Sequence, residues 1–331
     1  MGPDMKPREF IISLAGTAAV WPLAATAQKA PTRIGWLSSG SEKSAVGLGF
    51  VADIKDGLRE NGMIEGRDYV LEARFADGVY ERFPDLVREL VQARVAIIVT
   101  NTIASVRAAQ RITPPVPIVM CPINDPVGNG LIASLARPGG MTTGVATLNE
   151  DLTAKMLEFQ RTVIPAVRTI AAIYNPGNPS NVQALEGIRT RALEMGINVL
   201  PIPLRSPQEL EAALATVASA RPDSLQIIAD SGTLDMTDRI AAFAKAQRLP
   251  SFSTQGNYAE IGGLLAYGAP RRKLVMKAGF YIKRILDGAN PGELPVQQPT
   301  QIELSINMKI ATALGIAVPA SLQQLADNLI E

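Results

Sequence analysis

Two short polar segments could bind a small anion, because each follows an apolar run and precedes a helical stretch. The segment Thr100-Asn101-Thr102 begins where the run Val95 to Val99 ends, and a helical pattern starts at Ile103. Free backbone N–H groups and the positive end of the helix dipole meet at such a point, which suits a carboxylate. The segment Ser38-Ser39-Gly40-Ser41 offers the same arrangement. The alternative for both segments is helix capping with no ligand bound.

Two aspartates follow predicted strands and could bind a cationic group. Asp230 ends the apolar run 225–229, and its carboxylate suits an ammonium group. Because Ser231-Gly232 follows, Asp230 could instead cap a turn or a helix. Asp125 precedes Pro126, and this dipeptide favours a turn in which the aspartate bonds its own backbone. Ligand contact is the second interpretation for Asp125.

Four further residues stand at the ends of predicted strands, where a ligand could reach them. They are Tyr174, Asn175, Thr254 and Tyr267. The two tyrosines could stack on an aromatic ligand or line a flat apolar slot. Trp36 could do the same, but its position among apolar neighbours makes packing in the core an equal alternative.

The composition excludes several kinds of catalysis. The chain has no histidine and a single cysteine, Cys121, so neither a Ser-His-Asp or Cys-His nucleophile nor a His/Cys zinc pattern can form. Carboxylate or lysine chemistry stays open, but we find no convincing nucleophile elbow after a predicted strand. We therefore expect no catalytic residue, no metal site and no cofactor. The net charge of +1, without a basic run, indicates no nucleic-acid partner.

Residues 1–27 have the pattern of a secretory signal peptide. Lys6 and Arg8 supply a short basic region, and an apolar segment too short to anchor in a bilayer follows. Ala25-Thr26-Ala27 forms an A-x-A cleavage site, so we expect cleavage before Gln28 and export to the periplasm. The export route, general secretory or twin-arginine, stays open.

The elements that must position these residues follow one repeated pattern. Apolar runs of strand length alternate with stretches of helical spacing, and the pattern restarts near residue 150. Such alternation predicts an α/β fold with two doubly wound, Rossmann-like halves, each built on a parallel sheet and joined near residues 139–149. A chain of 331 residues is long enough for two such cores. Ligands of these sheets bind beyond the carboxyl ends of the strands, which two facing halves turn into a cleft.

Six motifs spread along the mature chain point to a known family. They are Asn61 to Gly66, Asn124 to Gly128, Ser134 to Gly144, Gly262 to Gly268, Leu294 to Thr300 and Leu314 to Pro319. Together they resemble the ABC-transporter substrate-binding family that includes tryptophan- and tyrosine-binding proteins. The resemblance covers essentially the whole mature chain.

This resemblance implies a type I periplasmic-binding-protein fold, in which the chain crosses three times between two lobes through a three-strand hinge. We expect the crossings near Thr147, Gly268 and Pro291. The expected first lobe comprises residues 28–147 and 269–291, and the expected second lobe comprises residues 148–268 and 292–331.

The resemblance also implies a function, the periplasmic solute-binding component of an ABC importer. Such a protein would capture a small carboxylate-bearing solute, an amino acid or an aromatic acid, in the interlobe cleft and would not be an enzyme. We expect a monomer whose partners are the solute and an ABC permease in the inner membrane. The alternative is a ligand-sensing protein that presents a solute to a membrane receptor, and the sequence does not separate the two.

Overall fold

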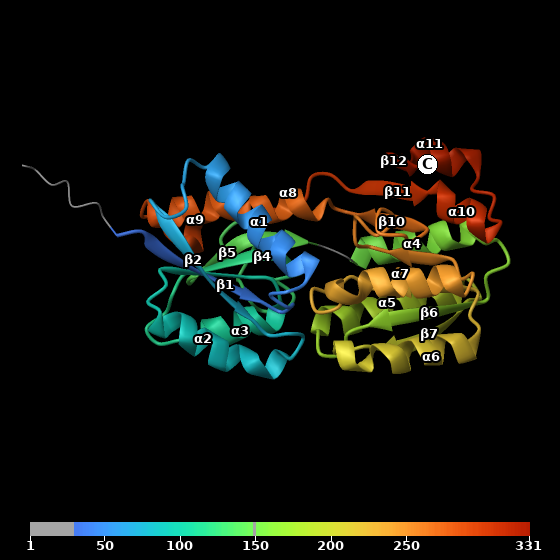
Figure 1. Cartoon of the computed structure of the whole chain (residues 1–331), viewed down its shortest axis with the longest axis horizontal. Coiled ribbons are helices and arrows are strands. Elements are labelled where there is room, and N and C mark those ends of the chain that lie inside the picture. Colours follow the sequence, from blue (N-terminus) through green and yellow to red (C-terminus); the bar gives the residue numbers. More distant parts are fainter. Residues whose placement is uncertain (1–29, 148–149) are drawn as a thin grey trace, which may run out of the picture. The chain divides into compact units, whose positions relative to one another are not determined.

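The computed structural model describes residues 30–147 and 150–331. The expected signal peptide and its cleavage site therefore lie outside the described residues. Pro31–Glu331 form one unit by their internal contacts. Within this unit the strands form two separate sheets, and we call each sheet with its covering helices a lobe (Figure 1).

The sheet of the first lobe has five strands in the order β2-β1-β3-β4-β5, all parallel. The strands are β1 (Thr32–Ser38), β2 (Tyr69–Phe75), β3 (Ile97–Thr100), β4 (Ile118–Asn124) and β5 (Thr142–Thr147). Strand β5, which ends at the expected crossing near Thr147, was not among the predicted strands. The strand contains Gly144 at a φ of 133°, where a Cβ would lie 2.3 Å from the carbonyl oxygen of Met120. The sequence of this strand is difficult to predict as a buried strand, because it consists mostly of glycine and small polar residues and lacks the large apolar side chains typical of strands.

Helices cover both faces of the first sheet. They are α1 (Ala45–Glu60), α2 (Phe83–Gln92) with the preceding turn η1 (Tyr80–Arg82), α3 (Ile103–Gln110), α8 (Arg271–Met276) and α9 (Ala278–Leu286). Along β1, Ile34 and Trp36 pack with α1, α8 and α9, whereas Leu37 packs with α2 and α3 (Figure 1). This alternation is the two-residue period of a strand. Trp36 is fully buried and stacks on Phe50, so it belongs to the core.

The last two of these helices were expected as one, spanning residues 272–286. The structure interrupts the helix at Lys277, whose φ of −60° and ψ of −21° are nearly helical. The apolar period therefore continues through the break, and no residue in the sequence marks it. Close packing holds α9 on α1, since a Cβ at Gly279 would lie 2.2 Å from the backbone of Gly57.

The sheet of the second lobe has seven strands in the order β12-β11-β10-β9-β8-β6-β7. The strands are β6 (Thr169–Tyr174), β7 (Asn198–Pro203), β8 (Ser224–Ile227), β9 (Ser251–Ser253), β10 (Leu265–Gly268), β11 (Glu303–Asn307) and β12 (Asn328–Ile330). The expectation of a parallel sheet needs one correction, because β10 and β11 are antiparallel. The chain leaves β10 for the first lobe and returns at the same edge, so β11 must run the opposite way.

Helices also cover both faces of the second sheet. They are α4 (Glu150–Val163), α5 (Pro179–Glu194), α6 (Leu210–Ala220), α7 (Thr237–Ala246), α10 (Met308–Leu314) and α11 (Ala320–Leu325), with the turns η2 (Pro207–Glu209) and η3 (Leu234–Met236). Ala171 and Ile173 of β6 pack with α6 and α7, whereas Ile170 and Ala172 pack with α4 and α5. No helix within residues 30–147 and 150–331 has the length and apolar character that a membrane span requires.

The segment after α9 stays with the first lobe for longer than expected. The turn η4 (Pro291–Glu293) is followed by Val296, whose N–H donates to the carbonyl of Leu135, and by Gln297, which forms a β-bridge with Val145. Strand β11 of the second lobe begins only at Glu303. The chain therefore crosses after Gln297, later than the boundary expected near Pro291, because the Pro-rich segment first packs along the edge of β5. The predicted α/β class, with two lobes each built on its own sheet, is confirmed.

Candidate ligand-binding site

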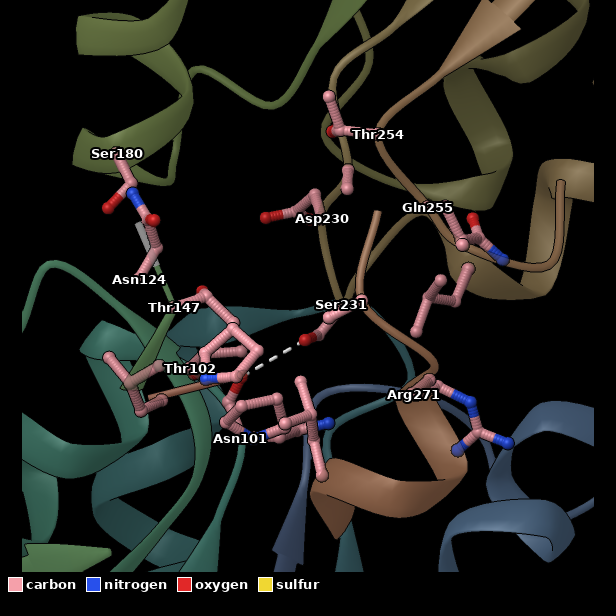
Figure 2. A pocket seen from close by; sticks show the side chains of 18 of the residues that line it. Asn101, Thr102, Asn124, Thr147, Ser180, Asp230, Ser231, Thr254, Gln255 and Arg271 are labelled. Carbon is pink, nitrogen blue, oxygen red and sulfur yellow. Dashed lines mark hydrogen bonds between the residues drawn. The ribbon is translucent and has the colours of Figure 1, made fainter. Parts of the chain in front are cut away.

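A cavity of about 140 Å³ lies between the lobes, beyond the carboxyl ends of their central strands (Figure 2). The polar residues of its wall are Asn101, Thr102, Asn124, Thr147 and Arg271 from the first lobe and Asn178, Ser180, Asp230, Ser231, Thr254 and Gln255 from the second. The apolar side chains include Phe50, Ile103, Leu152, Leu234, Leu274 and Ile302. The wall therefore combines an apolar surface with one carboxylate and one guanidinium.

Hydrogen bonds join the two lobes around this cavity. The hydroxyl of Ser231 donates to the carbonyl of Asn101 at 3.0 Å, as Figure 2 shows. The N–H of Ser41 donates to Oδ2 of Asp235 at 3.0 Å, and Tyr80 Oη donates to Oδ1 of Asp230 at 3.3 Å. The lobes are thus joined directly by at least three hydrogen bonds.

On the first-lobe side the wall is the N-terminus of α3. Thr102 is the N-cap, and its Oγ1 accepts from the N–H of Ser105 at 3.1 Å. The hydroxyl of Ser105 accepts in turn from the N–H of Thr102, which completes a capping box. The side chain of Thr102 therefore serves the helix, and the amide of Ile103, which has no carbonyl to bond within the helix, is available to the cavity.

Thr100 does not line the cavity, although it stands next to residues that do. It is fully buried, and its hydroxyl donates to the carbonyl of Leu37 at 2.8 Å. This bond joins β3 to β1 in the core. Asn101 does line the cavity, and its Oδ1 also accepts from the N–H of Ser39 at 3.3 Å.

On the second-lobe side Asp230 is the central residue. It is 4% exposed, and its Oδ1 accepts from Asn175 Nδ2, from the N–H of Gly232 and from Tyr80 Oη. Among the described residues, its Oδ2 accepts from Asn178 Nδ2 alone, at 2.7 Å. A carboxylate oxygen accepts about two hydrogen bonds, so Oδ2 keeps capacity for another donor. Figure 2 shows the Asp230 side chain reaching into the cavity.

The same carboxylate affects the tyrosine that reaches it from the first lobe. Burial, and then the negative charge of Asp230, raise the pKa of Tyr80 well above its usual value. Tyr80 therefore stays protonated and donates its hydrogen bond across the lobes throughout the ordinary pH range.

Thr254 differs from the other hydroxyl residues of the wall. It is 6% exposed, and its Oγ1 is buried without a hydrogen-bond partner among the described residues. A buried hydroxyl without a partner is costly. A ligand in the cavity would supply the missing partner.

Four of the twelve residues predicted to bind the ligand line the cavity, namely Asn101, Thr102, Asp230 and Thr254. Asn175 stands just behind the wall and holds Asp230. The residues of the Ser38 to Ser41 segment and Asp125 do not line it. Asp125 bonds the N–H of Gly128 through its Oδ1, which is the turn that the sequence favoured.

The predicted aromatic contacts lie away from the cavity wall. Tyr267 packs edge-on against Phe159 at a centroid distance of 5.2 Å, in an apolar cluster of the second lobe. Tyr174 packs against the apolar cluster under α4 and α5. Tyr174 ends β6 and Tyr267 is the next-to-last residue of β10, but both side chains pack against the covering helices.

Sequence reasoning missed two notable wall residues, Phe50 and Arg271. Phe50 lies in the middle of α1, where a single aromatic residue carries no local signal. Arg271 opens α8 directly after the crossing that follows β10. That position was detectable, because a charged residue that follows a predicted crossing lies near the hinge and therefore near the cleft.

The described residues contain no group of three or more side chains suited to bind a metal ion. Cys121 is fully buried in β4, and burial raises the pKa of its thiol to about 12. A thiol with such a pKa is not a nucleophile at neutral pH. The groups of the cavity wall can therefore bind a ligand through hydrogen bonds and through the charges of Asp230 and Arg271.

Comparisons with known proteins indicate the family and the fold to which this site belongs. A family model described as "ABC transporter substrate binding protein" matches residues 48–330. A tyrosine-binding protein of Clostridioides difficile strain R20291 is 24% identical over 260 residues, which cover 78% of this chain and 74% of that protein.

Two solved structures share the fold. One is an ABC domain from Streptococcus pneumoniae in complex with L-Trp, which has a TM-score of 0.80 and 24% identity and covers 91% of this chain and all of the other. The second is a conserved domain protein from Vibrio cholerae, with a TM-score of 0.82 and 23% identity over 90% of this chain and 99% of that one.

Proposed function

The chain belongs to the ABC transporter substrate binding protein family, as its motifs predicted, and from this membership we propose that it captures a small carboxylate-bearing solute for an ABC importer. The solute is an amino acid or an aromatic acid, bound between the two lobes. The protein then presents it to a permease in the inner membrane. It acts without catalysis and without a cofactor.

The observation that carries this proposal is the chemistry of the cavity wall. Asp230 and Arg271 place one negative and one positive group on a wall that is otherwise apolar or uncharged. A zwitterionic amino acid loses its hydration when the lobes enclose it, which is costly unless opposite charges and fixed donors replace the water. The free amide of Ile103 and the side chains of Asn101 and Thr254 are such polar partners.

The size of the cavity supports a small solute. Its volume of about 140 Å³ is close to the ~150 Å³ of an apolar cavity that holds one benzene molecule. The volume therefore favours a small amino acid or a single-ring aromatic acid over a larger solute. The names of the relatives, a tyrosine-binding protein and a complex with L-Trp, support the same class.

Export is the second part of the proposal. The basic residues, the apolar segment and the Ala25-Thr26-Ala27 site support cleavage before Gln28 and a periplasmic location. This location is where an importer collects its solute.

Thermal-shift screening of amino acids and aromatic acids tests the binding function. A solute that binds only the native state stabilises it by RT ln(1 + [L]/Kd), roughly 2.7 kcal/mol at a hundredfold excess over Kd. We expect a few clear shifts among these compounds. Shifts only with nucleotides or metal ions would contradict the assignment.

Native mass spectrometry of protein from the periplasmic fraction tests export and identifies the solute. We expect a chain that begins at Gln28 and carries a bound molecule of the mass of one amino acid or aromatic acid. A full-length chain confined to the cytoplasm would refute the transport role. Uptake of the identified solute in cells that lack the gene separates import from sensing, because only an importer subunit is needed for accumulation.

A further inference from the structure

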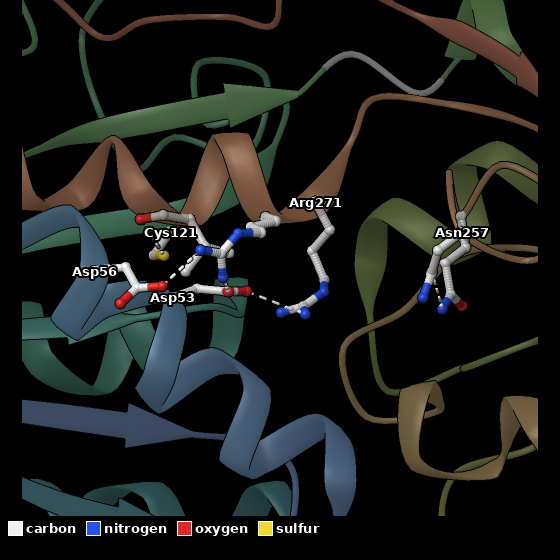
Figure 3. A network of polar contacts seen from close by, with 8 residues as sticks. Asp53, Asp56, Cys121, Asn257 and Arg271 are labelled. Carbon is white, nitrogen blue, oxygen red and sulfur yellow. Dashed lines mark hydrogen bonds and ion pairs between the residues drawn. The ribbon is translucent and has the colours of Figure 1, made fainter. Parts of the chain in front are cut away.

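Two adjacent arginines at the start of α8 use their hydrogen-bond donors in opposite ways. Arg272 donates from Nη1 to Asp53 Oδ1 and from Nη2 to Asp56 Oδ2, both at 2.6 Å. Arg271 makes no hydrogen bond with any residue that the structure describes, although its guanidinium carries five N–H donors. Figure 3 shows Arg271 with Asp53 and Asp56 between α8 and α1.

The surroundings of Arg271 hold its guanidinium in place without satisfying it. The guanidinium carbon lies 4.4 Å from the centroid of the Phe50 ring, a cation–π contact. Nη2 lies 3.1 Å from Asp53 Oδ2, but this oxygen has no hydrogen bond, so the contact is one of charge only. The side chain is 26% exposed and Nη1 is fully buried. Unused donors of a largely buried cation are costly, which indicates that another partner belongs there.

The charges of the network lead to the same conclusion. Asp53 and Asp56 are the two carboxylates, and Arg59, Arg271 and Arg272 are the guanidiniums that pair with them. Three positive charges against two negative ones leave one positive charge. Arg272 and Arg59 hold hydrogen-bonded carboxylate oxygens, so the uncompensated charge falls to Arg271. Of these three arginines only Arg271 lines the cavity.

We propose that Arg271 is the anion-recognition residue of the cavity and binds the carboxylate of the solute through its free guanidinium N–H groups. Planar guanidinium donors match a carboxylate geometrically, and the pair is strongest where water is excluded. Phe50 and Asp53 are the positioning residues that keep the guanidinium at the wall. This inference rests on the proposed function and names the residue that would select a solute with a carboxylate.

The matched variants Arg271→Gln and Arg272→Gln test the inference, with L-tyrosine, L-tryptophan, L-leucine and benzoate as probes in calorimetry. For each acid that binds the wild type, Arg271→Gln is expected to weaken binding roughly 10- to 150-fold, the range for a lost charged hydrogen bond. Arg272→Gln is expected to change the affinity by less than about threefold, because its partners are carboxylates away from the ligand. The carboxamide of the same probe should lose little of its weaker binding in Arg271→Gln.

Stability separates recognition from a structural role. Without ligand, Arg271→Gln is expected to keep the melting temperature of the wild type, whereas Arg272→Gln lowers it by breaking two hydrogen-bonded ion pairs. An acid that binds Arg271→Gln as tightly as the wild type would overturn this inference and leave the proposed function intact. Wild-type protein that binds none of the four acids at millimolar concentration would overturn both. Equal losses in both variants would make Arg271 structural.

Discussion

The two lobes differ in how the polar side chains in or next to the cavity wall are hydrogen-bonded. In the first lobe, the hydroxyls of Thr100 and Thr102 are already bonded to their own lobe, one to the carbonyl of Leu37 and the other within the cap of α3. In the second lobe, the hydroxyl of Thr254 has no partner among the described residues and Asp230 Oδ2 has one. A buried donor or acceptor that is satisfied internally stabilises the fold, whereas one left open at a cavity wall is able to bond a ligand there.

This difference assigns different tasks to residues that look alike in the sequence. The hydroxyls of Thr100 and Thr102 hold the sheet and the helix that shape the cavity. The first lobe would then contact the proposed solute through backbone amides and Arg271. In the second lobe, Thr254 Oγ1 and Asp230 Oδ2 keep hydrogen-bonding capacity that the proposed solute would use. Substitutions of the two first-lobe threonines should therefore change stability, and those of the two second-lobe residues should change affinity.

Asp230→Ala should have the largest effect. It removes the proposed partner of the ammonium group and one acceptor each of Tyr80 and Asn175. We expect the affinity for a bound amino acid such as L-tyrosine to fall by at least about 100-fold, measured by calorimetry, because a buried cation is left unpaired. Asp230→Asn, which keeps the volume, should lose nearly as much.

Asp223→Ala is the matched control for this prediction. Asp223 lies in the same lobe, and its Oδ2 accepts from the N–H groups of Arg168 and Thr169 far from the cavity wall. It should affect stability and leave affinity unchanged. Should 3-(4-hydroxyphenyl)propionate, which lacks the ammonium group, lose as much affinity in Asp230→Ala as L-tyrosine, Asp230 would be a latch between lobes and not a ligand contact.

Thr254→Val and Thr100→Val form a pair that tests the comparison directly, since both variants remove a hydroxyl and keep the shape. We expect Thr254→Val to weaken binding about 5- to 30-fold without lowering the free energy of unfolding, because its hydroxyl bonds only the ligand. Thr100→Val should lower the free energy of unfolding by about 1–3 kcal/mol, because it leaves the carbonyl of Leu37 short of a partner. Urea unfolding and calorimetry on both variants measure the two quantities.

The comparison between the lobes would be contradicted if Thr100→Val lost affinity and Thr254→Val lost stability. Loss of affinity in Thr100→Val with normal stability would mean that the first lobe, and not the second, supplies the open hydroxyl.

Among the substitutions at the cavity wall, Thr102→Ala should change binding least. Its hydroxyl caps α3, so the free energy of unfolding should fall by about 1 kcal/mol, the usual cost of a lost N-cap. The affinity should change by less than about threefold, because the amide of Ile103 remains. Chemical unfolding and calorimetry check both values, and a loss of affinity beyond tenfold would show that the hydroxyl itself contacts the solute.

Local patterns along the chain were enough to predict the class of the fold, the family and part of the cavity wall. Alternating strands and helices require parallel sheets, and the carboxyl ends of their strands must converge. Asn101, Thr102, Asp230 and Thr254 were found in this way, because each follows a strand that local apolar runs reveal. The place of each residue at the end of a strand follows from the residues next to it in the sequence, and a single sequence is enough to show it.

Which of these side chains reach the ligand depends instead on contacts between distant segments. Ser39, Thr100 and Thr254 have the same kind of side chain at the same kind of strand end, yet of these three only Thr254 lines the cavity. Arg271 and Phe50 join the wall because the crossing after β10 carries α8 back onto α1, more than 200 residues away along the chain. The partners of a hydrogen-bonding group are set by packing between such segments, and a local pattern holds no record of that packing.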